Sequence, residues 1–231
     1  MDFVRPVEAV IPGVQGRVLA VLAETTSELN LSTLARLAGV SVAQASRVMP
    51  DLVDLGLVER REVPPSALFR MVREHVASQA VLALASARSN ALERISDAAA
   101  SINPRPVSVV VFGSFARGEA GRASDIDVLV VRDDTVDEDD ETWWESLDAW
   151  RRQVRALTGN PVELLEVSAA ESARKVHSRS ELWRDIARDG VVVAGSPLAA
   201  LSGTAHAEAD SYASRDERAG ALLRRQGPGI P

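Results

Sequence analysis

The sequence contains no cysteine and only one lysine, Lys175, among its 231 residues. The absence of cysteine excludes disulfides and thiolate metal sites, and it suits a reducing compartment. Aromatic residues make up 4% of the chain, so the core must rest on the aliphatic residues that bring the apolar fraction to 46%. The excess of arginine over lysine, together with abundant alanine, is typical of GC-rich bacterial coding. These features predict a globular chain without covalent cross-links.

Long apolar segments are also missing, since none reaches the roughly 20 residues that a membrane helix needs. The first five residues lack the basic start and apolar stretch of a secretion signal. The formal net charge of −7 argues against general binding of polyanions. We therefore expect a soluble, cytoplasmic protein that does not contact a membrane.

The first third of the chain has the apolar spacing of short helices. Ser41 is placed to cap the third of these helices. We expect this helix to kink or shorten at Pro50, because proline removes a helical hydrogen bond. A hairpin is predicted over residues 58–72, with a Pro-Pro-Ser turn at 64–66.

The remainder of the chain begins with a long helix, predicted over 76–102 and ended by Asn103-Pro104. The strands predicted after this break cover 107–112, 126–131 and 162–167. A helix over 138–157 separates the last two strands, and its packed face is expected to hold Trp143, Leu147, Trp150 and Val154. Beyond Pro197 the chain is small, polar and punctuated by Gly and Pro, which predicts a flexible tail.

Two carboxylates stand at the start of the second predicted strand, at Asp125 and Asp127. Residues two apart on a strand point to the same face, so these side chains are expected to lie side by side. Two ionised carboxylates about 4 Å apart repel by about 4 kcal/mol at an effective dielectric constant of 20. A divalent cation reverses this repulsion, and Mg²⁺ prefers one or two carboxylates combined with triphosphate oxygens.

The turn that ends the preceding strand, Gly113-Ser114, completes a pattern suited to phosphate. Glycine lets the backbone approach a phosphate group closely, and the serine offers a hydroxyl and a backbone N–H near a helix start. Arg117 can neutralise charge on a departing pyrophosphate. The alternative interpretation of residues 107–131 is an ordinary buried hairpin.

The segments Gly113-Ser114-Phe115-Ala116-Arg117-Gly118 and Ser124-Asp125-Ile126-Asp127-Val128-Leu129-Val130 closely resemble the signature of DNA polymerase beta-like nucleotidyltransferases. The likeness is greatest to the small bacterial members. It implies a mixed sheet flanked by helices, a nucleoside triphosphate substrate (ATP is expected) and Mg²⁺ or Mn²⁺. The nucleotide-binding residues that it implies are Gly113, Ser114, Arg117 and Ser124.

The resemblance also implies a third acidic residue on a later strand, which helps to activate the acceptor hydroxyl. Glu163 is our candidate, although many relatives carry Asp there. Asp125, Asp127 and Glu163 are thus the expected catalytic residues and metal ligands. Glu166 has the opposite strand parity and is expected to face solvent.

The segments 31–41 and 52–58 resemble a winged helix-turn-helix domain, the first at its central turn and the second where the recognition helix runs into the wing. In that family the third helix enters the major groove of DNA. The implied DNA-binding residues are Gln44, Ser46 and Arg47 on this helix and Arg60 and Arg61 on the wing. Because acidic and basic residues roughly cancel over 15–75, DNA binding is expected to favour a homodimer. The alternative is a winged helix used for protein contacts.

Together these features predict an α+β protein of two domains, a winged helix-turn-helix and a mixed-sheet nucleotidyltransferase. The predicted boundaries are 1–75, a connecting helix over 76–103, 104–197 and a flexible tail over 198–231. The first functional hypothesis is a Mg²⁺-dependent nucleotidyltransferase that modifies a hydroxyl on a small molecule, protein or RNA. The second is a DNA-binding regulator or antitoxin-like protein whose nucleotidyltransferase domain senses nucleotide or is catalytically degenerate. Small relatives often work beside a separately encoded partner protein, which the resemblance suggests here too.

Overall fold

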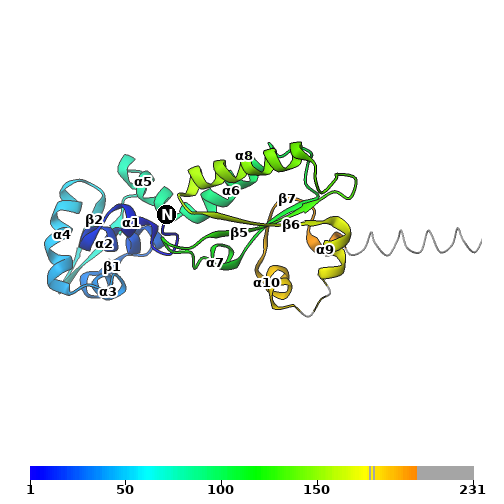
Figure 1. The fold of residues 1–231 in the computed structure, drawn as a ribbon. Coiled ribbons are helices and arrows are strands. Elements are labelled where there is room, and N and C mark those ends of the chain that lie inside the picture. Colours follow the sequence, from blue (N-terminus) through cyan, green and yellow to red (C-terminus); the bar gives the residue numbers. More distant parts are fainter. Residues whose placement is uncertain (177, 179, 202–231) are drawn as a thin grey trace, which may run out of the picture. The chain divides into compact units, whose positions relative to one another are not determined.

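The computed structural model describes residues 1–176, 178 and 180–201, and the chain forms two compact units (Figure 1). The first unit comprises Met1–Ile95 with the segments Arg117–Asp125 and Arg155–Pro161, and the second comprises the other described residues. Each unit combines helices with its own sheet, so the predicted α+β class is confirmed. Across the described residues, no helix has both the length and the apolarity that crossing a bilayer demands.

The first unit contains the predicted winged helix-turn-helix. Its elements are α1 (Pro6–Val10), α2 (Gly13–Glu24), β1 (Leu29–Asn30), α3 (Leu31–Leu37), α4 (Val42–Asp54), β2 (Val58–Val63), β3 (Ser66–Met71) and α5 (Val76–Ala85). The strands pair antiparallel in the order β1-β3-β2, and β2 with β3 forms the predicted hairpin. A core of aliphatic side chains, including the fully buried Leu22, Leu34 and Leu52, holds the helices against this sheet.

Helix α4 begins as the sequence predicts. The Ser41 hydroxyl accepts a hydrogen bond from the Gln44 N–H at 3.1 Å, and Gln44 Oε1 accepts one from the Ser41 N–H at 2.9 Å. This reciprocal capping box satisfies two donors that a helix start otherwise leaves unpaired. The helix is not shortened at Pro50, because α4 continues through this residue to Asp54. Met49 and Leu52, on either side of it, are buried in the core, and their packing offsets the lost helical hydrogen bond.

The second unit is built on a mixed sheet in the order β6-β5-β4-β7. Its elements are β4 (Ser108–Phe112), α7 (Gly113–Arg117), β5 (Ile126–Arg132), α8 (Glu141–Thr158), β6 (Val162–Ser168), α9 (Ala169–Lys175), α10 (Glu181–Asp189) and β7 (Val191–Gly195). β5 pairs parallel with β6, and the other pairs are antiparallel. The predicted strands after Pro104 are therefore confirmed, and the apolar run at 191–193 forms an edge strand.

Helices cover both faces of this sheet (Figure 1). The predicted stripe of α8 is confirmed, since Trp143, Leu147, Trp150 and Val154 are all fully buried. On the opposite face, Trp183 and Ile186 of α10 pack with Leu129 of β5. Asp127 lies on the α10 face because it shares strand parity with Leu129.

Outside these cores lie the predicted connecting helix and the predicted tail. The single helix predicted over 76–102 is wrong, because Ser86 ends α5 and a separate α6 (Ala87–Ala99) follows. In the predicted tail, Leu198 is buried with the α10 core. The part of the tail from residue 202 onward lies outside the described residues.

Candidate active site

The turn at Gly113 meets the second predicted aspartate directly. Gly113 follows β4 with φ +69°, a left-handed conformation that L-residues with a side chain rarely adopt. A Cβ at this position would collide with Asp127 Oδ2 and would stand only 3.0 Å from Cγ. Glycine is therefore required twice, by the backbone angle and by the neighbouring carboxylate. The structure thus brings together two of the residues predicted from the sequence.

Glu163 and Asp127 are register partners on the parallel strands β5 and β6. Neighbouring strands lie about 4.8 Å apart, and partners in register point to the same face. Phe112 is the antiparallel partner of Asp127 on the other side, so Asp127 lies between the end of β4 and Glu163. Asp127 is half-buried, whereas Glu163 is exposed. Glu163 is therefore the more accessible of these two carboxylates.

Asp125 precedes β5 by one residue and is exposed. Its spacing of two from Asp127 predicts that the two carboxylates lie on one side of an extended backbone. Within the described parts of the chain, no three acidic or histidine side chains gather closely enough to hold a metal ion.

Arg117, predicted to neutralise the departing pyrophosphate, ends the short helix α7. Its Nε lies 2.8 Å from Glu119 Oε2, and both side chains are substantially exposed. Exposed pairs of this kind contribute at most about 1 kcal/mol. The ion pair with Glu119 therefore contributes little to fixing the guanidinium of Arg117.

Ser124, predicted to bind nucleotide, closes a small turn in the loop before Asp125. Its Oγ accepts a hydrogen bond from the Gly121 N–H at 3.0 Å, and its own N–H donates to Gly121 O at 3.2 Å. The side-chain amide of Asn160 donates to Ser124 O at 2.8 Å. Sequence reasoning missed Asn160, because its partners lie more than 30 residues away and no local spacing marks them.

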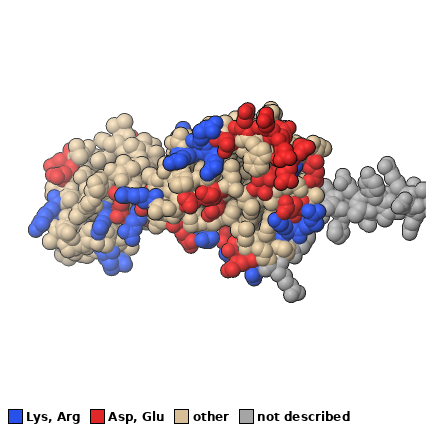
Figure 2. Space-filling view, viewed as in Figure 1, with Lys and Arg blue, Asp and Glu red and all other residues tan. Residues whose placement is uncertain are grey.

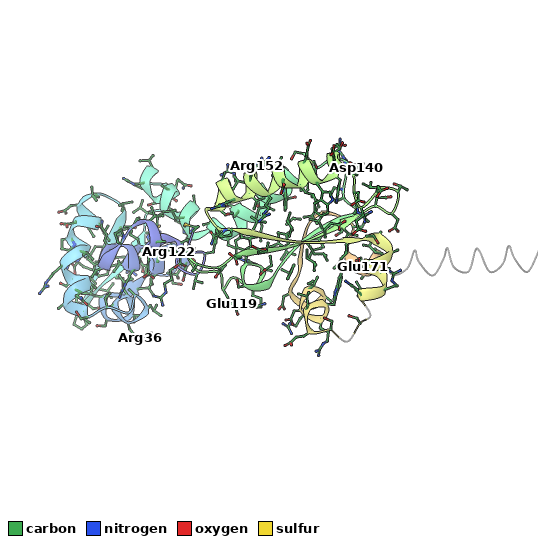
Figure 3. All side chains as sticks on the ribbon, viewed as in Figure 1. Arg36, Glu119, Arg122, Asp140, Arg152 and Glu171 are labelled. Carbon is green, nitrogen blue, oxygen red and sulfur yellow. The ribbon has the colours of Figure 1, made fainter. Side chains whose placement is uncertain are left out.

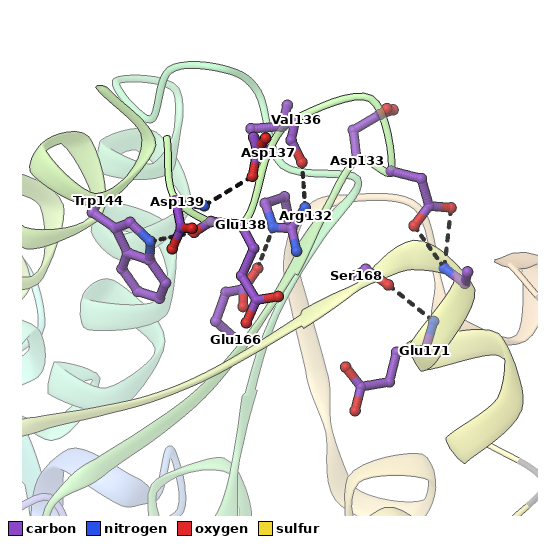
Figure 4. A network of polar contacts seen from close by, with 12 residues as sticks. Arg132, Asp133, Val136, Asp137, Glu138, Asp139, Trp144, Glu166, Ser168 and Glu171 are labelled. Carbon is purple, nitrogen blue, oxygen red and sulfur yellow. Dashed lines mark hydrogen bonds and ion pairs between the residues drawn. The ribbon is translucent and has the colours of Figure 1, made fainter. Parts of the chain in front are cut away.

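The expectation that Glu166 faces solvent is wrong. Its Oε1 lies 2.7 Å from Arg132 Nε, and the two side chains are only 12% and 9% exposed (Figure 4). Strand parity correctly put Glu166 on the face opposite Glu163. That face, however, is the one against α8, and Arg132 on the neighbouring strand supplies the counter-charge. Arg132 also donates to Val136 O and so ties the following loop to the sheet.

The acidic segment 133–141 gives the second unit a concentration of negative side chains (Figure 2). Hydrogen bonds from Thr135 lower the pKa of Asp133 below its usual value. Asp134 accepts from the Ala170 N–H at the start of α9. Asp140 precedes α8 while Arg152 lies in its second half (Figure 3), an order that suits the helix dipole. These contacts explain the segment as a structured, solvated loop.

The residues predicted to touch DNA lie on two elements of the first unit. Gln44, Ser46 and Arg47 are exposed on α4, with Gln44 Oε1 engaged in the capping box. On β2, Arg60 pairs with Glu62 at 2.7 Å and Arg61 pairs with Glu28. The hydrogen bond from Arg61 is the main reason that the pKa of Glu28 lies below its usual value. The wing arginines are thus partly neutralised by neighbouring glutamates.

Comparison with known families agrees with this architecture. Residues 92–185 match the nucleotidyltransferase domain family, and residues 16–62 match the IclR helix-turn-helix domain family. The chain therefore carries a nucleotidyltransferase domain, which is a transferase domain, after an IclR-type helix-turn-helix domain. The two resemblances read from the sequence are confirmed at this level.

Among solved structures, the chain is similar to a toxin-antitoxin with AMP-PNP, with TM-score 0.34 and 18% identity over 58% of this chain and 96% of the other. It is also similar to two mutants of the toxin-antitoxin MntA-HpeT. One has TM-score 0.33 and 17% identity over 58% of this chain and 96% of the other. The second has TM-score 0.31 and 19% identity over 54% and 94%. No curated protein matches the chain. The domain assignment rests on the two family matches.

Proposed function

We propose that this chain transfers a nucleoside monophosphate from a nucleoside triphosphate, with ATP expected, to a hydroxyl acceptor in the presence of Mg²⁺. The observation that supports this reaction best is the row formed by Gly113, Asp127 and Glu163 at one edge of the sheet. Two neighbouring carboxylates repel each other and gain little from burial, so an ordinary structural role explains them poorly. The bare backbone of Gly113 gives the carboxylate of Asp127 its space beside the turn.

Asp125 and Asp127 are the residues that would hold the metal. An open carboxylate pair fits Mg²⁺, which typically binds one or two carboxylates and completes its shell with water and substrate phosphates. Mn²⁺ has similar ligand preferences. When bound, the cation supplies charge neutralisation for the triphosphate. The missing third protein ligand is therefore compatible with the proposal.

In the proposed reaction, the oxygen of the acceptor hydroxyl attacks the α-phosphorus of the triphosphate. The new P–O bond forms as the bond to the β-phosphate bridging oxygen breaks, and pyrophosphate leaves. Glu163 accepts the proton of the hydroxyl, and Arg117 stands near the turn to offset charge on the departing pyrophosphate. Ser114 contributes its hydroxyl and backbone N–H to the phosphates. Catalysis then depends mainly on positioning and charge neutralisation.

The direct test is to incubate the full chain with each α-labelled nucleoside triphosphate and Mg²⁺, with and without cell extract. Label transfer and pyrophosphate release are both measured. Asp125→Asn is expected to abolish both, with a nearly unchanged melting temperature because Asp125 is exposed. Asp139→Asn makes the same chemical change at an exposed residue outside the site and is expected to keep full transfer. Retained transfer in Asp125→Asn would exclude this assignment.

For the first unit we propose DNA binding. Helix α4 carries the exposed Gln44, Ser46 and Arg47 on one element, and such a helix in an IclR-type domain suits the major groove. This function also supports the second hypothesis, a regulator that reads DNA while its other domain binds nucleotide. A separately encoded partner protein and a homodimer remain predictions from the sequence.

A gel-shift experiment at low salt with fragments of the source genome tests this proposal. The wild-type chain is expected to retard specific fragments, and Arg47→Ala is expected to weaken that binding by roughly tenfold or more. Arg152→Ala removes the same charge from the nucleotidyltransferase domain and serves as the control. An absence of retardation at low salt would leave the winged helix as a module for protein contacts.

A further inference from the structure

Asn160 is fully buried in the turn between α8 and β6. Its Nδ2 donates to Ser124 O at 2.8 Å and to Gly121 O at 3.3 Å, and a further contact reaches Met1 O at 3.3 Å. Its Oδ1 accepts a hydrogen bond from the Met1 N at 2.6 Å. Both ends of the amide are therefore satisfied without water. A buried polar side chain with this many partners specifies the local backbone, since losing them would leave unpaired groups.

The partners of Asn160 lie mainly in the loop that separates α7 from β5. This loop has no regular secondary structure, and other contacts also hold it. Phe3 N donates to Ala120 O at 2.9 Å, and the small turn at Gly121 and Ser124 closes on itself. The side chain of Asn160 donates hydrogen bonds to the two carbonyl groups at the ends of this turn. The amide of Asn160 therefore fixes both ends of the turn formed by Gly121 and Ser124.

The loop that Asn160 holds ends one residue before Asp125, the proposed metal ligand. Ser124 supplies the carbonyl that receives the shortest hydrogen bond from Asn160 Nδ2, and Asp125 follows immediately. Asp125 is exposed, so its orientation depends on its backbone and not on packing around its side chain. Along the chain, Asn160 also stands three residues before Glu163. Asn160 thus fixes the backbone immediately before one of the proposed catalytic carboxylates, Asp125.

We propose that Asn160 is a positioning residue for Asp125, which it holds in place through the Ser124 carbonyl. This inference rests on the proposed nucleotidyl transfer and deepens it. Residues that orient metal ligands from behind typically affect metal affinity by roughly 10- to 100-fold when they are replaced. A purely structural residue would instead lower stability and leave the metal affinity of the folded protein unchanged.

The test compares Asn160→Asp with the wild-type full chain. The substitution keeps the size of the side chain but replaces the donor group by an oxygen that would face two carbonyls. Asn90→Asp is the matched control, because exposed Asn90 in the same unit donates to a single carbonyl, Ala83 O at 3.2 Å. Asn160→Ser removes the amide without adding charge and serves if Asn160→Asp does not fold.

Two readouts separate positioning from stability. The first is hydrogen exchange of peptides covering residues 118–127. The second is Mn²⁺ affinity in the presence of α,β-methylene-ATP, followed by the electron paramagnetic resonance signal of free Mn²⁺. We expect the Asn160 variant to exchange faster in this loop, to bind Mn²⁺ roughly 10- to 100-fold more weakly and to recover transfer at high Mn²⁺. Asn90→Asp is expected to match wild type in loop exchange, in Mn²⁺ affinity and in transfer.

The outcomes are distinct. Faster loop exchange with wild-type Mn²⁺ affinity would overturn the positioning role and leave Asn160 as a structural residue. Unchanged hydrogen exchange in the loop would overturn the inference as well, because the hydrogen bonds from Asn160 would then not hold the loop in place. If the wild-type chain itself binds no Mn²⁺ with the nucleotide analogue, the proposed function fails and this inference fails with it. That result is recognised in the wild type, before any variant is compared.

Discussion

Gly113 leaves the space that the carboxylate of Asp127 occupies. The absent Cβ would fall on Asp127 Oδ2, and the backbone at Gly113 is already left-handed at φ +69°. The turn at Gly113 and the second aspartate are thus matched parts of one local structure. The position of the Asp127 carboxylate on β5 depends on the lack of a side chain at Gly113, at the end of β4.

Gly113→Ala tests this match. A left-handed residue with a Cβ costs about 1–2 kcal/mol, and the clash must also displace Asp127. A displacement of about 1 Å in a catalytic group can lower the rate by about 100-fold, so we expect a loss of transfer of at least this size. Gly13→Ala is the control, since Gly13 has φ +86° with nothing within 4 Å of the added Cβ. Thermal melts measure stability, and label transfer measures activity. An equal loss of stability in the two variants, with transfer lost only in Gly113→Ala, would confirm that Gly113 positions Asp127.

Glu163 gives a second prediction. Glu163→Gln removes the group that accepts the acceptor proton, so we expect kcat to fall by roughly 10²-fold or more, with nucleotide affinity retained. The exposed position of Glu163 predicts an unchanged melting temperature. Glu163→Asp keeps the carboxylate and is expected to retain part of the activity. Steady-state kinetics measure kcat, and a nucleotide titration measures affinity. An unchanged kcat in Glu163→Gln would contradict this role.

The ion pair between Arg132 and Glu166 gives a prediction about stability. Removing one partner of a buried pair leaves an uncompensated charge and costs about 3–5 kcal/mol, so Glu166→Ala is expected to destabilise the second unit strongly. The double variant Arg132→Met with Glu166→Leu is expected to lose less than Glu166→Ala alone. Urea denaturation measures both.

The exposed pair Arg60–Glu62 provides the comparison, with side chains 52% and 66% exposed. Glu62→Ala is expected to cost less than about 1 kcal/mol. An equally small effect at Glu166 would show that the buried pair contributes no more than a surface pair.

Glu28 gives a prediction about DNA. Glu28→Gln frees Arg61 from its carboxylate partner and is expected to increase the affinity for DNA. It should also steepen the dependence of log K on log salt by up to about one unit. Glu74→Gln makes the same change of charge in the same unit, away from Arg61, and is expected to have a smaller effect on that slope. Binding isotherms at several salt concentrations decide between them, and a lower affinity in Glu28→Gln would contradict the role of Arg61.

Local signals in the sequence account for most of the fold. The strand boundaries, the hairpin and the helix cap at Ser41 follow from spacing within a few residues, and the structure confirms them. Pro50 could not be placed in this way, because burial of Met49 and Leu52 against the core decides that α4 continues. The break at Ser86 likewise has no strong local mark.

In the candidate site, too, local sequence predicts some features, and others depend on residues distant in the chain. Gly113 and Asp127 belong to one motif, so the sequence predicts them together, and their contact follows from strand pairing. The pairing of Arg132 with Glu166 depends on which strands become neighbours, and parity alone assigned only the face. Asn160 illustrates the limit, because its role arises entirely from backbone groups distant in the chain.

The parallel alignment of β5 and β6 makes Glu163 vulnerable to changes in length. A shift of one residue would bring Leu164 opposite Asp127 and turn the glutamate toward the α8 side. Insertions or deletions between α8 and β6 should therefore inactivate the enzyme more thoroughly than many point substitutions nearby. Natural variation in this connection is expected to conserve its length.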